Sequence, residues 1–281
     1  MTYQYLFKTF KQALSEVFDE TEVNSIFFIA VEYITGMSRT DFYLNSEERA
    51  PTNTREFLYK VMNRLKKGEP IQYILNEAWF MERKYYVDHN VLIPRSETEE
   101  IIGIVKSIAP EAKKVLDIGT GSGCIAISLS LSMPANVWAM DNNEDILYIA
   151  QKNAIANKAE VNFFKDDILN PAKQWEKPFD VIVSNPPYVK MSEKQLMQKN
   201  VLDFEPEKAL FVADNDPLVF YKAIYRYSQK YLSDHGVVVL EINESLAHET
   251  KALFEGSFSK VESIRDIHNK ERFVTAQHER K

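Results

Sequence analysis

The stretch VLDIGTGSGCIAISLS, residues 115–130, decides the fold of this chain. Its first residues are apolar and β-branched, as in a buried strand, and its last residues form an apolar run of helical length. Between them, Gly119, Gly121 and Gly123 let the backbone turn sharply and come close to a ligand. A glycine-rich turn from a strand into a helix is typical of the nucleotide-cofactor loop of an open α/β sheet.

Downstream of this stretch, apolar strands alternate with helical segments. We expect strands at 136–141, 161–167, 179–185 and 236–243, and helices at 122–132, 143–157, 217–232 and 245–254. The strands are rich in Val and Ile and lack polar alternation, which indicates a mostly parallel sheet covered by helices on both faces. Residues 261–267 and 272–276 are expected to pair as an antiparallel edge, giving seven strands in all.

Upstream of it, the chain has a different character. Through the first seventy residues, aromatic and apolar side chains recur three and four positions apart, which predicts helices. Residues 79–87 mix aromatic, charged and β-branched side chains without that period and predict a β-hairpin. We therefore expect a helical domain at 1–70, a β-hairpin linker at 71–94 and an α/β domain at 95–281. Ser96 with Glu99 three residues later has the form of a capping box that opens a helix.

The composition of the chain disfavours several classes of binding partner. The formal net charge is -7 and no block of like charge stands out, which disfavours a direct nucleic-acid partner. The single cysteine, Cys124, has apolar neighbours and is expected to be buried, and the five histidines lack metal-ligand spacing. We found neither a signal-peptide pattern nor an apolar run long enough to span a bilayer. These features predict a cytoplasmic protein that holds no metal and binds no membrane. We expect it to be a monomer, although none of these features fixes the oligomeric state.

Two carboxylates flank the glycine turn. Asp117 lies two positions ahead of Gly119, and Asp141 closes the next predicted strand, where a carboxylate can accept hydrogen bonds from both hydroxyls of a ribose. The G-x-G-x-G spacing differs from the dinucleotide pattern, and Asp117 would repel a pyrophosphate but suits a cation. S-adenosylmethionine carries an adenosine, an ammonium and a sulfonium, and is the predicted cofactor. The alternatives are a nicotinamide or flavin dinucleotide and a turn that only connects strand and helix.

A second motif, SNPPYV at 184–189, follows the strand expected at 179–185. In a parallel sheet, the carboxyl end of this strand should lie beside the glycine turn. Asn185 offers an acceptor, Pro186 and Pro187 stiffen the turn, and Tyr188 supplies a flat wall. Together they predict a slot for a planar group whose NH₂ donates to the Asn185 side-chain oxygen and the Pro186 carbonyl. Such acceptors would stabilise the charge that develops on a weakly nucleophilic nitrogen, whereas the alternative is a rigid strand end without chemistry.

With these motifs, the chain resembles the N5-glutamine methyltransferases of peptide chain release factors, the PrmC or HemK family. The resemblance covers nearly the whole chain through GEPIQYIL (68–75), LIPRSETE (92–99), LDIGTGSGCIA (116–126), SNPPYV (184–189), EPEKAL (205–210) and EIN (241–243). It implies a class I S-adenosylmethionine-dependent methyltransferase, Rossmann-like in fold, whose small helical N-terminal domain recognises the substrate. The implied reaction is methylation of the glutamine in the Gly-Gly-Gln loop of class 1 release factors. An amino methyltransferase of adenine or guanine and a non-catalytic adenosyl-binding module are the alternatives.

The resemblance also implies roles for individual residues. Asn185, Pro186, Pro187 and Tyr188 would hold the glutamine. The implied cofactor site consists of Asp117, Gly119, Thr120, Gly121, Ser122, Gly123, Asp141, Asn142, Asp167, Ile168 and Asn185, with Arg95 and Thr98 on the cofactor side. Asn76 and Asn243 stand where the family usually has glycine. Because Asn tolerates positive φ better than most residues, we expect neither to break the backbone.

Overall fold

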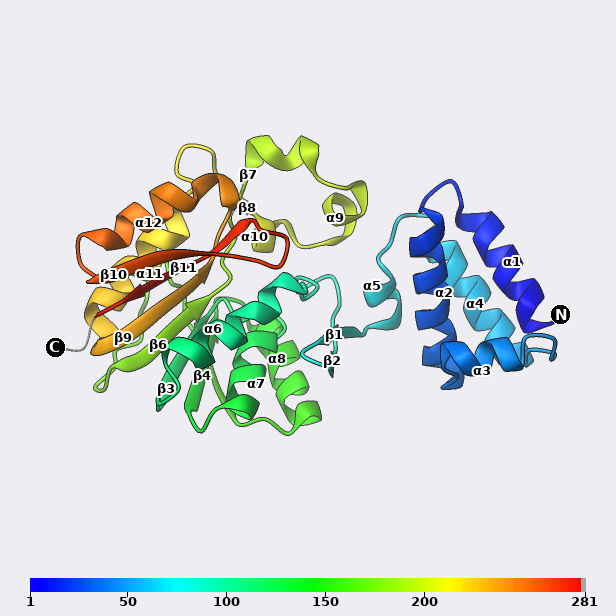
Figure 1. The fold of residues 1–281 in the computed structure, drawn as a ribbon, viewed down its shortest axis with the longest axis horizontal. Helices are drawn as coiled ribbons and strands as arrows, with labels where there is room; N and C mark the ends of the chain where they lie inside the picture. Colours follow the sequence, from blue (N-terminus) through cyan, green and yellow to red (C-terminus); the bar gives the residue numbers. More distant parts are fainter. Residues whose placement is uncertain (279–281) are drawn as a thin grey trace. The chain divides into compact units, whose positions relative to one another are not determined.

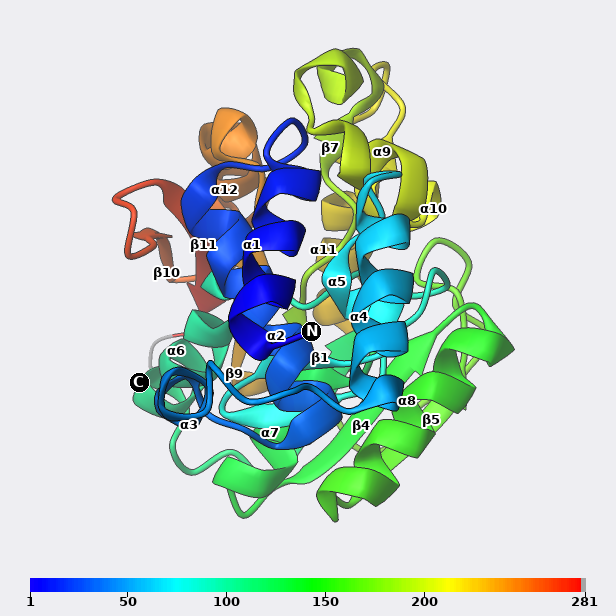
Figure 2. The same cartoon turned by 90° about the vertical axis from the view of Figure 1, so that its right-hand side faces the viewer.

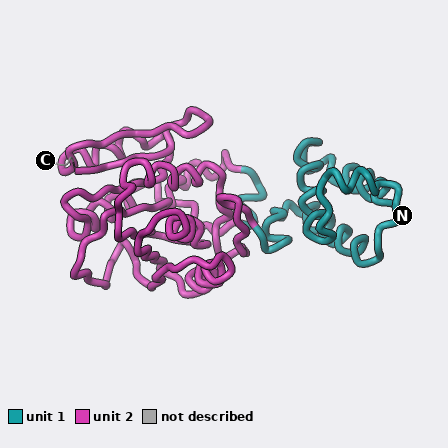
Figure 3. The backbone as a smooth tube through the Cα atoms, turned by 60° about the horizontal axis from the view of Figure 1, so that its bottom comes forward, with its two compact units in different colours: residues 1–77, 198–204 teal, residues 78–197, 205–281 magenta. Residues whose placement is uncertain are grey.

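The computed structural model of this chain describes residues 1–278. The chain forms two compact units (Figure 3), one of Met1–Glu77 with Gln198–Phe204 and one of Ala78–Met197 with the chain from Glu205 onward. The predicted bounds at residues 70 and 94 differ from this division. The short helix α5 (Ile71–Leu75) belongs to the first unit and the hairpin belongs to the second. The roles assigned to the three predicted parts stay predictions.

The first unit is helical, as the spacing of its apolar residues predicted. It contains α1 (Tyr3–Leu14), α2 (Glu20–Thr35), α3 (Arg39–Leu44), α4 (Thr52–Leu65), α5 and α9 (Lys199–Phe204). In α1 the buried residues are Tyr3, Leu6, Phe10 and Leu14, which form one face of the helix. That face packs with Phe27 and Phe42 in a core rich in aromatic rings.

Asn76 ends α5 in the left-handed conformation, with φ 53° and ψ 36°. Its backbone N–H donates to the carbonyl oxygens of Gln72 and Tyr73. Asn is one of the few residues with a side chain that adopt this conformation readily, so the helix ends normally without glycine. The expectation for Asn76 is confirmed.

The second unit is built on a seven-stranded sheet with the order β10-β11-β9-β6-β3-β4-β5. The strands are β3 (Lys114–Ile118), β4 (Asn136–Asp141), β5 (Val161–Lys165), β6 (Phe179–Ser184), β9 (Leu232–Glu241), β10 (Lys260–Arg265) and β11 (Glu271–Gln277). Five strands run parallel, and β11 pairs antiparallel with β9 and with β10. The predicted parallel sheet with an antiparallel edge is confirmed.

Helices cover both faces of this sheet (Figures 1 and 2). One face packs against α6 (Glu100–Ile108), α7 (Cys124–Ser132) and α8 (Glu144–Asn157), and the other against α11 (Val219–Tyr231) and α12 (Ala247–Glu255). Along β6, Val181 and Val183 face the first group and Ile182 faces the second. Because both faces are covered, the strands read as continuous apolar runs. Cys124 is buried in α7, as expected, and burial raises the pKa of its thiol to about 12.

Shorter elements complete the second unit. The predicted hairpin is present as β1 (Ala78–Phe80) paired antiparallel with β2 (Arg83–Tyr85), and Met81 and Glu82 take positive φ at its turn. The remaining elements are η1 (Glu97–Glu99), β7 (Val189–Lys190), η2 (Met191–Leu196), α10 (Glu207–Leu210), β8 (Phe211–Val212) and η3 (Glu244–Leu246). Among the described residues, no helix combines the length and apolar character needed to traverse a bilayer.

The predicted capping box at Ser96 is wrong. Ser96 has helical dihedral angles, φ -60° and ψ -38°, and its side chain makes no capping hydrogen bond. Its hydroxyl donates instead to Glu97, and the Glu99 carboxylate accepts from the backbone N–H of Met81 in the hairpin, at 2.8 Å. The Glu99 carboxylate, which the local sequence pattern assigned to capping the helix, is therefore bonded to the hairpin instead.

Candidate active site

The two predicted motifs meet at the carboxyl edge of the sheet. Strands β3 and β6 are parallel neighbours, with Ile118 opposite Ser184. The Ser184 hydroxyl donates to the carbonyl oxygen of Ile118 at 2.7 Å. The glycine turn and the NPPY turn therefore begin side by side, as the sequence predicted.

The glycine turn is conformationally demanding. Gly119, Gly121 and Gly123 all have positive φ, at 72°, 54° and 83°. At Gly119 and Gly121 an added Cβ would meet no protein atom within 4 Å, so the backbone faces open space there. At Gly123 it would lie 3.1 Å from Ile127 and 3.2 Å from Ala150, so tight packing adds to the positive φ in favouring glycine there. The first two glycines thus leave the backbone accessible to a ligand.

Buried polar groups hold the turn in place. The backbone N–H groups of Gly119 and Thr120 both donate to the carbonyl oxygen of Met140, at 2.9 Å. The Asn153 side chain donates to the carbonyl oxygen of Ser122 at 2.8 Å and exchanges hydrogen bonds with the backbone of Tyr86. These bonds fix the turn against the next strand and against the segment that follows the hairpin.

Asp117 lies fully buried beneath the turn. Its Oδ2 accepts from the Thr120 hydroxyl at 2.7 Å, while its Oδ1 has no hydrogen-bond partner among residues 1–278. Burial raises the pKa of this carboxyl to about 7. A buried carboxylate oxygen without a partner is costly. Because this oxygen is shielded from solvent, Asp117 would act on a bound cation through its charge and not through a direct contact.

Asp141 ends β4 on the other side of the turn. Its two oxygens accept from the backbone N–H groups of Gly121, at 3.2 Å, and Asn143, at 3.3 Å. The backbone N–H of Asp166 donates to the Asp141 carbonyl oxygen, which brings the end of β5 beside it. The predicted Asp167 and the buried Ile168 follow directly in the chain, and Asn142 lies exposed next to Asp141.

The NPPY turn is anchored on both sides of Tyr188. The Tyr188 N–H donates to the carbonyl oxygen of Leu210, and the Asn243 side chain donates to the Tyr188 carbonyl oxygen, at 3.2 and 3.1 Å. Pro186 is buried. With two prolines and these backbone bonds, the turn has little freedom, which fits the predicted slot.

The Asn185 side chain enters a chain of hydrogen bonds. Its Nδ2 donates to Thr98 Oγ1 at 3.2 Å, and the Thr98 hydroxyl donates to Glu241 Oε2 at 2.7 Å. The Tyr188 hydroxyl donates to the other Glu241 oxygen at 3.0 Å. No residue in the range 1–278 donates to Asn185 Oδ1, so this oxygen is available to a ligand.

Thr98 and Arg95 contact other residues than those of the glycine turn. Thr98 is buried between Asn185 and Glu241, and the Arg95 guanidinium pairs with buried Glu205 at 2.6 Å. Glu205 also accepts from the backbone N–H of Ile93, so this pair joins the LIPRSETE segment to EPEKAL. Their place on the cofactor side remains a prediction.

The sequence reasoning missed Glu241 as a site residue. The available signal was a carboxylate at the end of an apolar strand, GVVVLE, which is the signal that selected Asp117 and Asp141. The expectation for Asn243 was also wrong in its reason, because φ at this residue is -70°. Its side chain instead bridges Tyr188 and Glu193, a role that glycine could not fill.

Two protein-family models match separate parts of this chain, one in the helical unit and one largely in the α/β unit. Residues 6–75 match the model of the PrmC N-terminal domain, and residues 103–206 match that of the methyltransferase small domain. The release factor glutamine methyltransferase of Flavobacterium psychrophilum is 41% identical over 272 residues, covering 94% of this chain and 95% of that protein. The enzyme of the same name from Bacteroides thetaiotaomicron is 39% identical, covering 95% and 96%.

The chain belongs to the release factor glutamine methyltransferase family.

Solved structures agree with the fold of this family member. A 16S rRNA guanine-N2 methyltransferase from Thermus thermophilus, in complex with AdoMet and guanosine, superposes with a TM-score of 0.53 at 19% identity. The match covers 72% of this chain and 50% of that protein. At this identity the likeness supports the class I methyltransferase fold alone, because one fold serves many substrates. For a release factor glutamine methyltransferase, the arrangement at the carboxyl edge of the sheet is therefore the candidate active site.

Proposed function

We propose that this chain transfers a methyl group from S-adenosylmethionine to the side-chain amide nitrogen, N5, of the glutamine in the Gly-Gly-Gln motif of class 1 peptide chain release factors. The observation that carries the proposal is the Asn185 carboxamide beside the glycine turn, with its Oδ1 open to a ligand. Membership in the family, over nearly the whole chain, supports the substrate. We further propose that the enzyme acts as a cytoplasmic monomer.

The residues at the glycine turn fit the cofactor. The charge of Asp117, buried beneath the turn, would attract an ammonium group, and Gly119 and Gly121 leave the backbone uncovered. Asp141 would accept from the ribose hydroxyls, and Asp167 and Ile168 would contact the adenine. When bound there, S-adenosylmethionine supplies a methyl group activated by a sulfonium.

The NPPY turn would activate the acceptor nitrogen by hydrogen bonding. An amide nitrogen is a weak nucleophile because its lone pair is delocalised into the carbonyl. Asn185 Oδ1 and the Pro186 carbonyl oxygen would each accept one of its hydrogens, which stabilises the positive charge that develops on nitrogen. The same two bonds fix the direction of the lone pair, and the Tyr188 ring would border the planar group.

The competing function is methylation of an amino group on a nucleic-acid base. The NPPY turn by itself would also accept that group. The net charge of -7 gives no general attraction to phosphate backbones and disfavours this alternative.

Labelled cofactor separates these functions. We expect transfer to a recombinant class 1 release factor and none to a matched release factor whose Gly-Gly-Gln glutamine is alanine. Single-stranded DNA, duplex DNA and ribosomal RNA serve as the competing acceptors. Incorporation into nucleic acid, or equal incorporation into the alanine-substituted release factor, would refute the proposed function.

Cofactor affinity should depend on pH through Asp117. Because the pKa of its carboxyl is raised to about 7 in the free protein, the carboxyl is protonated below that pH and offers no negative charge to a cationic group. We expect Kd to rise about tenfold per pH unit as the pH falls below 7, and to level off above it. Calorimetry between about pH 5.5 and 8.5 measures this, with Asp117→Asn as the variant that should lose the dependence. A wild-type affinity that is flat over this range would contradict the assignment.

The same carboxyl affects folding stability in the opposite sense. The folded state holds the Asp117 proton more tightly than the unfolded state, whose carboxyl has the ordinary pKa of 3.8. The contribution of Asp117 to stability therefore falls as the pH rises from about 4 to about 7. Bound cofactor should offset this loss, because the positive charge of the ligand stabilises the ionised carboxylate.

A further inference from the structure

A buried chain of hydrogen bonds ends on the Asn185 carboxamide. It starts at Glu241, the last residue of β9, passes through Thr98 in η1 and reaches Asn185 after β6. Glu241 and Thr98 are only 2% and 3% exposed, so water does not compete for these bonds. The Tyr188 hydroxyl, from the same turn as Asn185, occupies the second oxygen of Glu241.

The direction of this chain is fixed by the supply of protons. A hydroxyl has one proton to give, and the Thr98 hydroxyl donates to Glu241. Since the Thr98 proton goes to Glu241, the Thr98 oxygen offers only lone pairs to Asn185. The NH₂ end of the carboxamide must therefore face Thr98, which directs Oδ1 away from it.

Burial, hydrogen bonds and neighbouring charges shift the pKa of the Glu241 carboxyl in opposite directions. Burial raises the pKa of its carboxyl, and Glu97 acts in the same sense, while the hydrogen bonds from Thr98 and Tyr188 and the charge of Arg272 lower it. The Arg272 side chain donates to Asp266 at 3.0 Å, and Asp266 is buried. The buried carboxylate of Asp266 thus holds the Arg272 side chain, whose charge acts on Glu241.

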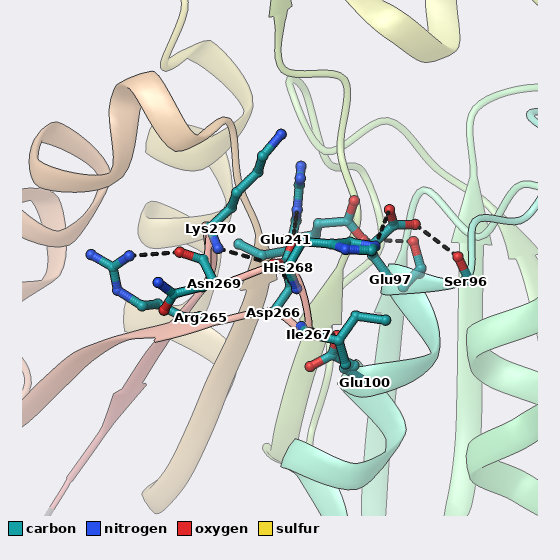
Figure 4. Close-up of polar contacts among 12 residues, drawn as sticks. Ser96, Glu97, Glu100, Glu241, Arg265, Asp266, Ile267, His268, Asn269 and Lys270 are labelled. Atoms are coloured by element: carbon teal, nitrogen blue, oxygen red, sulfur yellow. Dashed lines mark hydrogen bonds and ion pairs between the residues drawn. The ribbon is translucent and has the colours of Figure 1, made fainter.

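Asp266 belongs to the turn between β10 and β11, and the backbone of this turn holds its carboxylate in place (Figure 4). Asp266 accepts from the backbone N–H groups of His268 and Lys270, at 2.9 and 3.0 Å. The backbone N–H of Ile267 donates to Glu100 at 3.0 Å, which attaches the turn to the start of α6, next to η1. The antiparallel edge of the sheet therefore braces the segment that carries Thr98.

We propose that Thr98 and Glu241 are positioning residues that set the orientation of the Asn185 carboxamide. In this role they act through Asn185, so Thr98, predicted from the sequence to lie on the cofactor side, would not itself contact the cofactor. The inference rests on the proposed function, because the oriented Oδ1 is the acceptor for the substrate NH₂. A reversed carboxamide would place an N–H against the N–H of the substrate and remove the interaction.

The first test uses a matched pair of variants. Thr98→Val keeps the shape of the side chain and removes the hydroxyl, whereas Thr98→Ser keeps the hydroxyl. We expect Thr98→Val to lower kcat about 10- to 100-fold, with KM for the release factor and Kd for the cofactor changed less than about threefold. Thr98→Ser should stay within about threefold of wild type. Equal losses in both variants, or a loss carried by cofactor Kd, would overturn the inference.

The second test is a double-mutant cycle. If Thr98 acts only through Asn185, Thr98→Val should change kcat less than about twofold in an Asn185→Ala background. A full further loss in that background would place Thr98 in direct contact with the reactants and refute its positioning role. The wild-type assay in the same series tests the proposed function separately, because without wild-type transfer to the release factor that function fails first.

A third measurement needs no altered Thr98 or Glu241. In protein carrying isotope-labelled asparagine, the Asn185 side-chain NH₂ signals are assigned by their loss in Asn185→Ala. We expect one of the two protons to be protected from exchange with solvent in the ligand-free wild type. Fast exchange of both protons would refute the bond to Thr98, whatever the substrate of the enzyme.

Discussion

Asn185→Ala is expected to lower kcat for release-factor methylation about 10²- to 10³-fold while changing cofactor Kd less than about twofold. The substitution removes Oδ1, one of the two acceptors for the substrate NH₂, and this bond strengthens as positive charge develops on nitrogen. The glycine turn and its carboxylates stay in place, so cofactor binding is kept. Steady-state kinetics with labelled cofactor and calorimetric titration measure the two quantities.

A matched control for this substitution is Asn162→Ala. Asn162 lies exposed in β5 and donates to the Asn136 side chain and the Val137 carbonyl oxygen, at the opposite edge of the sheet. Its loss should leave kcat within about twofold of wild type. Turnover by Asn185→Ala equal to that of the control would contradict the slot for the acceptor nitrogen.

Asp141→Ala is expected to weaken cofactor binding about 100-fold or more. A carboxylate that accepts two hydroxyl hydrogen bonds contributes more than a neutral acceptor, and alanine removes both bonds at once. Asp141→Asn keeps one acceptor oxygen, so its Kd should fall between those of Asp141→Ala and wild type. At saturating cofactor, we expect the kcat of both variants to recover to within about fivefold of wild type.

The control for Asp141 is Asp145→Ala. Asp145 is an exposed carboxylate in the first turn of α8 and accepts no hydrogen bond from another side chain in the described part of the chain. Calorimetry should find its cofactor affinity within about twofold of wild type. Unaltered binding by Asp141→Ala would remove Asp141 from the ribose site.

Most of the fold was predictable because its signals are local. The recurrence of Tyr3, Phe7, Phe10 and Leu14 at three- and four-residue spacing predicts a helix within a few turns of chain. The apolar runs of β3, β6 and β9 mark strands buried on both faces. The capping-box prediction failed because a side chain that it assigned to a local hydrogen bond instead bonds to a distant segment of the chain. Glu99 accepts from Met81 in the hairpin, so it cannot complete a capping box with Ser96.

The sequence by itself determined the class of the protein and the two turns that face each other across β3 and β6. Local sequence alone predicts these turns, because their properties depend on consecutive residues. These properties are the conformational freedom of Gly119, Gly121 and Gly123 and the stiffness of Pro186 and Pro187. Only the tertiary structure decided which groups orient Asn185. Thr98 is 87 positions from Asn185 and 143 from Glu241 along the chain, and hydrogen bonds over such separations arise when the sheet brings its strand ends together.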